Sequence, residues 1–329
     1  MPATVEVGFA LSSEEHPPGE LVRQAVQAEE AGFAFIGISD HFHPWVKAQG
    51  HSPFVWGVLG AIAQATDRVR IGTGVTCPTI RMHPAIIAQA AATTACLMPG
   101  RFFLGVGSGE ALNEHILGDR WPPARVRLEM LEEAVEVIRL LWQGGSQDHS
   151  GKHYTLENAT VFDLPDTLPD IVVAGAGPRA ASLAARIGDG FWGTAPDSEA
   201  LETFGADGGA GKPRYGQITV CWAEDEEEAR KTAFQVWPNA AVKGQLPQDL
   251  PTPKHFEEAA GMVTEDDVSA MVVCGPDVHR HAALVKKYAE AGYTHVYIHQ
   301  VGPDQAGFLR FWQNDLRPAL AEQGLAAVA

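Results

Sequence analysis

The sequence predicts an α/β fold, a (β/α)₈ barrel of the TIM type that forms one domain over residues 1–329 and carries insertion segments. Three observations predict it. Short β-rich runs alternate with longer amphipathic runs, the short runs number eight, and apolar residues make up 45% of the 329 residues, which is enough for a large core. An open doubly wound sheet is the alternative, and it is disfavoured because no GxGxxG motif follows the first strand.

The expected strands are short apolar or β-branched runs bounded by polar and turn residues. They are Val5–Ala10, Ala34–Ser39, Val69–Thr73, Phe102–Val106, Ile171–Ala174, Gly190–Gly193, Gln217–Cys221 and Thr294–His299. Repeated strand–helix units bring successive strands parallel to one another, so eight of them are expected to close into a barrel.

The expected helices place apolar residues at helical spacing between the strands. They include Gly19–Ala31, Val55–Thr66, Pro84–Leu97, Arg125–Trp142 and Arg179–Ile187. Two segments interrupt the alternation. Gly144–Pro169 is rich in polar and turn residues, and Pro238–Pro253 holds four prolines and cannot form a regular helix. Such segments in a compact barrel are either functional lids or interface elements, or ordinary surface loops.

Composition and charge narrow the class of protein. The net charge of −17 disfavours binding to nucleic acid or to anionic membranes. No apolar run approaches the length of a membrane span, and the N-terminus lacks the basic start and apolar core of a signal peptide, so a cytoplasmic enzyme is expected. The four cysteines are scattered and no HExxH or comparable spacing occurs, so no metal site is expected.

The functional side chains of such a barrel lie where the strands end. Six strand ends in succession carry polar or glycine-rich residues, and together they predict a site. The candidates are Glu14; Asp40, His41 and Trp45; Gly74, Val75 and Thr76; Gly107, Glu110 and Asn113; Gly175, Ala176, Gly177 and Pro178; and Thr194. Taken singly, each has a structural interpretation: Asp40 and Glu110 as helix caps, the glycines as turns, and His41 and Trp45 as structural residues.

Six strings carry a resemblance to a known family. They are SDHFHPW (39–45), GTGVTCPT (72–79), HPAIIAQA (83–90), PGRFFLGVGSGEALNE (99–114), AGAGP (174–178) and ARIGDGF (185–191). In combination they resemble the F420-dependent glucose-6-phosphate dehydrogenases of the luciferase-like superfamily, with the weakest match over Ser198–Val268. The resemblance implies a luciferase-like barrel, coenzyme F420 as the cofactor, a small-molecule substrate and a homodimer.

The resemblance also implies catalytic roles. His41 matches the base that removes the substrate hydroxyl proton, Trp45 matches an aromatic residue that stabilises the charged intermediate, and Glu110 matches the acid near N1 of the deazaflavin. Glu14 and Thr194 match positions of the substrate pocket.

Further positions match the coenzyme site of that family. Asp40 matches a residue that hydrogen-bonds the deazaflavin ring, and Gly74–Val75 matches a non-proline cis peptide behind the ring. The other matching residues are Thr76, Gly107, Asn113 and the turn Gly175, Ala176, Gly177 and Pro178, whose backbone amides suit a phosphodiester.

One departure from the family bears on the substrate. Sugar-phosphate members place two lysines and an arginine around the substrate phosphate, and the matching positions here are Asp197, Pro247 and Ser269. The loss of three cations removes charge-assisted hydrogen bonds. We therefore expect Asp197 to line a pocket for a neutral or hydrophobic alcohol or sugar rather than for glucose 6-phosphate.

These expectations combine into a dehydrogenase that transfers a hydride between coenzyme F420 and a secondary alcohol or sugar hydroxyl. Oxidising such an alcohol needs a base on the hydroxyl and a hydride acceptor over the carbon, and a histidine suits the base. The same residues would serve an F420H2-dependent reductase of a carbonyl, enone or imine. An FMN-dependent luciferase-like monooxygenase is the third alternative.

Overall fold

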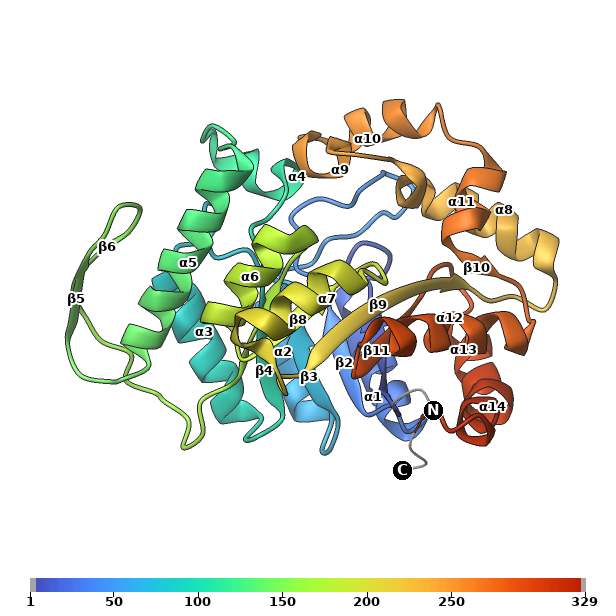
Figure 1. Cartoon of the computed structure of the whole chain (residues 1–329), viewed down its shortest axis with the longest axis horizontal. Coiled ribbons are helices and arrows are strands. Elements are labelled where there is room, and N and C mark those ends of the chain that lie inside the picture. The colour runs from blue at the N-terminus through green and yellow to red at the C-terminus, as the bar shows by residue number, and fades with distance from the viewer. Residues whose placement is uncertain (1–3, 327–329) are drawn as a thin grey trace.

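A closed parallel barrel forms the centre of the molecule (Figure 1). The computed structural model describes residues 4–326, and within that range eight strands close the barrel: β1 (Glu6–Leu11), β2 (Phe35–Ile38), β3 (Arg70–Thr73), β4 (Phe102–Val106), β7 (Ile171–Ala174), β8 (Gly190–Gly193), β9 (Arg214–Cys221) and β11 (His295–Gln300). The pairings of β1 with β11 and of β8 with β9 complete the circle. The predicted barrel is confirmed, and the open sheet is ruled out.

Large side chains fill the inside of the barrel. The inner cluster consists of Phe35, Phe103, Val172, Trp192, Tyr215 and Tyr297, all buried. Successive residues of a strand point to opposite faces, so the intervening residues face the surrounding helices. The crowding requires glycine at Gly105, where a Cβ atom would lie 1.9 Å from the carbonyl oxygen of Thr73. The interior is therefore packed, and only the carboxyl ends of the strands are left to form a site.

The surrounding helices agree with the predicted ones to within two residues at each end. These are α1 (Pro18–Glu30), α2 (Val55–Ala65), α3 (Pro84–Leu97), α5 (Ala124–Leu141) and α6 (Gly177–Ile187). The sequence analysis did not define α7 (Ser198–Phe204), α12 (Val278–Ala291), α13 (Gln305–Phe311) or α14 (Arg317–Glu322), which complete the outer layer. No helix in the described part of the chain has the length and apolarity needed to cross a membrane.

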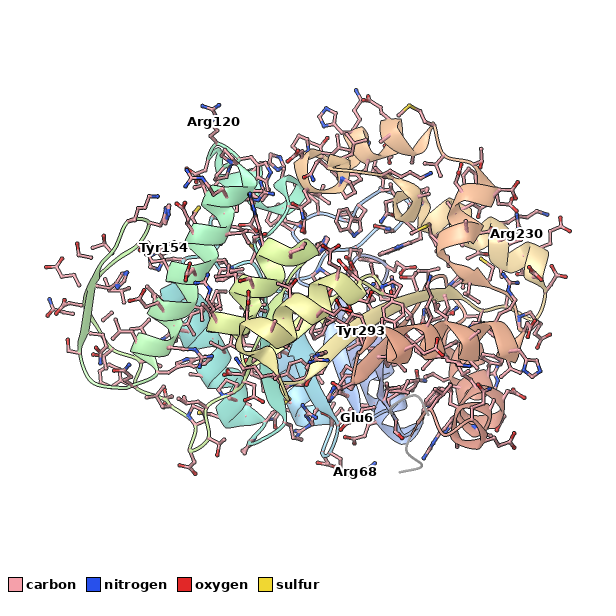
Figure 2. The ribbon with its side chains drawn as sticks, viewed as in Figure 1. Glu6, Arg68, Arg120, Tyr154, Arg230 and Tyr293 are labelled. Carbon is pink, nitrogen blue, oxygen red and sulfur yellow. The ribbon has the colours of Figure 1, made fainter. Side chains whose placement is uncertain are left out.

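The first insertion segment forms an antiparallel hairpin of β5 (Gln147–Ser150) and β6 (Thr155–Ala159), which stands beside α5 in Figure 1. The carboxylate of Glu133 on α5 holds the hairpin turn, because it accepts hydrogen bonds from the backbone N–H groups of Lys152, His153 and Tyr154. The hydroxyl of Tyr154, labelled in Figure 2, donates to the carbonyl oxygen of Thr79 at 2.9 Å. The hairpin is thus tied to the loop that follows β3.

The second predicted insertion segment, Pro238–Pro253, lies within a longer excursion, residues 226–274, that follows β9 at one end of the molecule (top right in Figure 1). This excursion contains α8 (Glu226–Val236), the 3₁₀ turn η3 (Pro238–Ala241), α9 (Leu246–Asp249), α10 (Pro253–Ala260), α11 (Glu265–Met271) and β10 (Val273–Cys274). As expected, residues 238–253 form no long helix, because prolines interrupt the backbone hydrogen bonding.

Candidate active site

The site predicted from the strand ends assembles around His41, in the loop that follows β2. Its Nε2 lies 3.3 Å from Oε1 of Glu14 and 3.6 Å from Oε1 of Glu110. Its Nδ1 lies 3.2 Å from the carbonyl oxygen of His43. A carbonyl oxygen can only accept a hydrogen bond, so Nδ1 carries a proton. The other ring nitrogen, Nε2, faces the two carboxylates. Residues from the ends of three strands, β1, β2 and β4, therefore meet at one imidazole.

Glu14 is a buried carboxylate held by hydroxyl groups. Its Oε2 accepts hydrogen bonds from Ser39 Oγ at 2.5 Å and from Ser12 Oγ at 3.2 Å. Burial alone would raise the pKa of Glu14, but the charge of a protonated His41 and the Ser39 hydrogen bond hold this pKa below its ordinary value. Glu14 is therefore an anion beside His41.

Glu110 and Asn113 form the β4 side of the site. Glu110 occupies the N-cap position of α4 (Ala111–Glu114) without capping it through its side chain; instead its Oε1 accepts from Asn113 Nδ2 at 2.6 Å. The Oδ1 of Asn113 accepts the backbone N–H groups of Phe42 and His43 at 2.8 and 3.1 Å. The same amide thus sets the path of the loop that carries His41 and aims Glu110 at it.

Trp45 forms an aromatic wall beside the imidazole. Its ring centroid lies 5.0 Å from that of His41 and 5.1 Å from that of Phe256 on α10. Trp45 also packs against the apolar cluster that contains Trp237. The excursion after β9, residues 226–274, therefore contributes aromatic side chains to the neighbourhood of the predicted base.

Asp40 does not cap a helix, because both oxygens of its carboxylate accept hydrogen bonds from side chains. Oδ2 accepts from Thr76 Oγ1 at 2.7 Å, and Oδ1 accepts from Arg81 Nη2 at 2.9 Å. The backbone N–H of Arg81 donates to Glu114 Oε2 at 2.7 Å. Burial raises the pKa of Glu114, and the bonds from Arg81 offset part of that rise.

Arg81 and Glu114 were missed by the sequence analysis. The available signal was a basic side chain seven residues after Gly74 in a strongly acidic chain, and a carboxylate next to Asn113. Glu114 ends the string 99–114 that carried the resemblance, but no role was attached to it, and Arg81 lies between two of the strings. Their 33-residue separation gave no reason to pair them.

Two glycine-containing turns shape the rest of the mouth. The peptide bond between Gly74 and Val75 is cis, as the resemblance implied. A Cβ atom at Gly107 would lie 2.8 Å from a methyl group of Val75, so only glycine fits against that bulge. At the end of β7, Gly177 begins α6 with a positive φ of 73°, followed by Pro178, and the N-cap residue Ala176 provides no side-chain cap. Together with Gly175 this turn leaves the first-turn amides of α6 without a side-chain acceptor at the N-cap.

The predicted substrate positions on later strands have other contacts. The carbonyl oxygen of Thr194, just after β8, accepts from Tyr288 Oη at 3.2 Å. Asp197 is the N-cap of α7, with Oδ1 accepting from Ala200 N at 3.0 Å. Pro247 lies in α9 and Ser269 in α11, where its hydroxyl donates to the Glu265 carbonyl oxygen at 2.8 Å.

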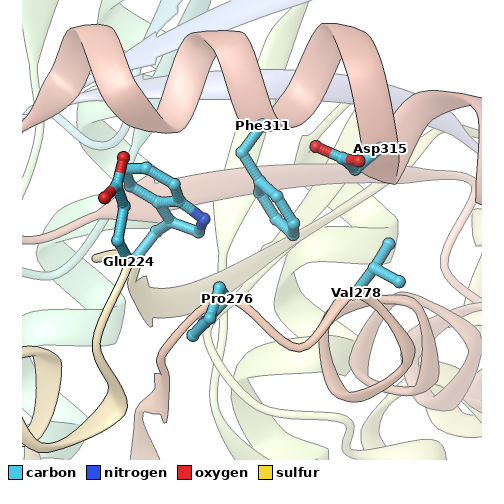
Figure 3. A pocket seen from close by; sticks show the side chains of 6 residues that line it. Glu224, Pro276, Val278, Phe311 and Asp315 are labelled. Carbon is cyan, nitrogen blue, oxygen red and sulfur yellow. The ribbon is translucent and has the colours of Figure 1, made fainter.

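A separate surface groove of about 330 Å³ lies on the outer side of the barrel (Figure 3). Its lining comes from the loops after β9 and β10, from the first residue of α12, and from α13 with the turn that follows it. The lining residues are Trp222, Glu224, Pro276, Val278, Phe311 and Asp315. None of the predicted site residues lines this groove. Within residues 4–326, no group of three or more His, Cys, Asp or Glu side chains is arranged to hold a metal ion.

Comparison with known families places this chain among barrel oxidoreductases. A family model described as luciferase-like monooxygenase matches residues 3–295. The F420-dependent glucose-6-phosphate dehydrogenase of Mycobacterium avium (strain 104) is 36% identical, over 98% of this chain and 100% of that protein. The enzyme of the same name from Nocardia farcinica (strain IFM 10152) is 37% identical, over 96% of this chain and 98% of that protein.

Solved structures of similar shape carry related names. An F420-dependent secondary alcohol dehydrogenase in complex with an F420-acetone adduct superposes with a TM-score of 0.89 at 30% identity, covering 96% of this chain and 99% of that one. The coenzyme F420 dependent tetrahydromethanopterin reductase from Methanopyrus kandleri superposes with a TM-score of 0.77 at 21% identity, with coverages of 96% and 99%. The second likeness shows the fold alone.

Proposed function

The chain belongs to the luciferase-like monooxygenase family, and within it we propose that this protein is an F420-dependent dehydrogenase whose substrate is a neutral secondary alcohol. The observation that carries the proposal is the position of His41, whose Nε2 lies within 3.6 Å of two carboxylates at the mouth of the barrel. Mouths of such barrels are where catalytic groups gather.

The residues present fit coenzyme F420. Asp40 and Thr76 offer polar atoms, the Val75 bulge against Gly107 offers an apolar backing, and the N-terminus of α6 offers amides for a phosphodiester. When bound, the deazaflavin supplies or accepts the hydride. Asp40, Gly74, Val75, Thr76, Gly107, Asn113 and the Gly175–Pro178 turn would hold it.

His41 is suited to take the hydroxyl proton. Because Nδ1 carries the proton shared with the His43 carbonyl oxygen, Nε2 has the free lone pair in the neutral ring. A proton accepted there lies next to Glu14 and Glu110, so the charge that the ring gains meets opposite charges. The Trp45 ring beside it offers a π face to the same cation.

The substrate class rests on Asp197 and on the aromatic wall. Asp197 is a carboxylate at the position where sugar-phosphate enzymes are expected to carry a lysine, and it is engaged in capping α7. Lys243 and Lys254 are the two lysines that could replace the missing cations; Lys254 is exposed and lies 3.8 Å from Glu258 on its own helix. Trp45 and Phe256 favour an apolar group near the reacting hydroxyl. Because relatives are named glucose-6-phosphate dehydrogenases, glucose 6-phosphate is the substrate against which neutral alcohols are to be compared.

We also propose that the protein is a homodimer. Phe54, next to α2, and Ile86, on α3, are 61% and 55% exposed, and apolar side chains of this size are often covered by a second subunit. The oligomeric state, the cytoplasmic location and the single-domain organisation stay predictions.

Two measurements test the proposal. Apoprotein is titrated with F420 and separately with FMN, with tryptophan fluorescence as the readout; quenching by F420 and no response to FMN is expected. The kcat/KM for F420 reduction is then compared for 2-propanol, cyclohexanol, glucose and glucose 6-phosphate. Glucose and its phosphate form the matched pair, and a highest kcat/KM for glucose 6-phosphate would refute the substrate assignment.

A further inference from the structure

Arg81 lies in the loop between β3 and α3 and contacts two buried carboxylates. Its Nη2 donates to Asp40 Oδ1 at 2.9 Å, and its Nε lies 3.5 Å from Glu114 Oε1. The side chains of Arg81, Asp40 and Glu114 are only 6%, 1% and 0% exposed. A guanidinium suits this position because its fixed planar fork reaches two acceptors at once.

Each carboxylate that Arg81 contacts adjoins the predicted coenzyme site through a different segment. Asp40 follows β2, precedes His41 and accepts the hydroxyl of Thr76, which stands beside the Gly74–Val75 bulge. Glu114 ends α4, directly after Asn113. Arg81 therefore joins the end of β2, the loop after β3 and α4, three segments that come together only in the folded barrel.

Arg81 is the cation that both buried carboxylates contact. Without it, Asp40 and Glu114 would be two carboxylates in a poorly hydrated region that have lost this cation, with Glu110 nearby at the N-cap of α4. A buried carboxylate without its cation is strongly disfavoured, so the carboxylate would turn away or take up a proton. In either case Asp40 would no longer present a fixed anion to a ligand at the mouth.

We infer that Arg81 is a positioning residue for the coenzyme: it holds Asp40 in the orientation that binds F420, through the Asp40–Arg81–Glu114 cluster. The inference rests on the proposed function, because it takes the coenzyme to be F420. Arg81 is not placed against the reacting atoms, so its effect reaches the coenzyme through Asp40.

The test compares Arg81→Met, Arg81→Lys and the control Arg101→Met. Arg101 is a matched arginine at the start of β4, where it donates to Thr66 and to the Val69 carbonyl oxygen at the opposite end of the barrel. Substitution of an outer-shell partner of a metal ligand lowers metal affinity by about 10–100-fold, and by analogy Arg81→Met should raise the Kd for F420 by about that factor. Turnover at saturating F420 should change much less, Arg81→Lys should restore part of the affinity, and Arg101→Met should lower Tm with the Kd unchanged.

A double-mutant cycle distinguishes an effect that Arg81 exerts through Asp40 from a general loss of structure. If Arg81 acts through Asp40, Arg81→Met should raise the Kd far less in an Asp40→Asn background than in the wild type. An equal rise in both backgrounds, or an unchanged Kd in soluble Arg81→Met, would overturn the inference. Failure of the wild type to bind F420 at all would instead refute the proposed function, so the two failures are distinguishable. If Arg81→Met does not fold, Arg81→Lys and Arg101→Met are compared in the same F420 titration. Equal Kd values for these two variants would overturn the inference.

Discussion

The two halves of the barrel mouth are built from different parts of the chain and by different means. The half that we propose to bind the coenzyme, called the coenzyme half, consists of Asp40, Thr76, Arg81, Asn113 and Glu114. It lies on the segments that follow β2, β3 and β4 and is held by hydrogen bonds, most of them to charged groups. The half that we propose to bind the substrate, called the substrate half, consists of Glu14, His41, Trp45 and Phe256. It joins one buried anion to aromatic rings, one of which, Phe256, comes from a segment more than 200 residues away. On this proposal the coenzyme half has to stay fixed in order to bind F420, whereas the substrate half can change with the substrate.

The largest expected effect is that of substituting His41, which should change turnover but not coenzyme binding. His41→Ala should lower turnover by about two to four orders of magnitude, because the base is lost, and should leave the F420 affinity largely unchanged. Steady-state kinetics and an F420 titration check both points, with the exposed His279→Ala as the control. Turnover close to that of the wild type would rule His41 out as the base.

The next prediction tests the substrate half by changing the charge of the substrate and the charge of residue 197. Each missing charge-assisted bond is worth about 1.5–3 kcal/mol, so neutral alcohols should exceed glucose 6-phosphate in kcat/KM by orders of magnitude. Asp197→Lys should improve phosphorylated substrates selectively, at a stability cost of about 0.5–2 kcal/mol because the α7 cap is lost.

Asp197→Asn provides the control for this substitution, because asparagine retains the cap and removes the charge. A uniform loss of activity towards both classes of substrate in Asp197→Lys would show that residue 197 does not face the substrate.

The pH dependence of the unfolding free energy should reveal the electrostatic contribution of Glu14. Its pKa in the folded state is lowered below the unfolded value of about 4.3, so the carboxylate adds stability above that pH and loses the contribution as pH falls through the folded pKa. The gap in unfolding free energy between wild type and Glu14→Gln should therefore be widest near neutral pH and narrow below about pH 4.

Urea denaturation at a series of pH values measures this gap, with Glu224→Gln in the surface groove as the control. A gap that stays constant with pH would show that Glu14 has no special electrostatic role.

The smallest expected effect concerns the hydrogen bond between Tyr154 and the loop after β3, the loop that carries Thr76 and Arg81 of the coenzyme half. Tyr154→Phe removes the hydrogen bond to the Thr79 carbonyl oxygen and should cost about 1–2 kcal/mol of stability. The F420 affinity should fall only slightly, because the loop keeps its bonds from Arg81 and Thr76. An unchanged urea midpoint would mean that the hairpin does not support this loop.

The difference between the halves also explains what could be predicted from the sequence. The barrel strands are buried apolar runs between turn residues, so Phe102–Val106 and Ile171–Ala174 were located to the residue. The polar strand Gln147–Ser150 has no apolar alternation and was not recognisable.

Among site residues, the strand ends identified His41, Glu110 and Asn113, which the structure brings together. The Arg81–Glu114 contact depends on tertiary pairing across 33 residues and had no local signal. The aromatic wall could not be assembled in advance, because residues 238–253 lack a regular period that would fix where Phe256 lies.

The closed barrel leaves the backbone of its strands without the free edges that open sheets present. Edge strands are the usual templates for pairing with another molecule and for aggregation. In the described range, strand edges remain at the two-residue β10, which pairs with β9 alone, and at the hairpin of β5 and β6, whose strands QDHS and TLENA are short and mostly polar. The native fold thus offers neighbouring molecules little β-structure to extend, even though the barrel strands themselves are strongly apolar.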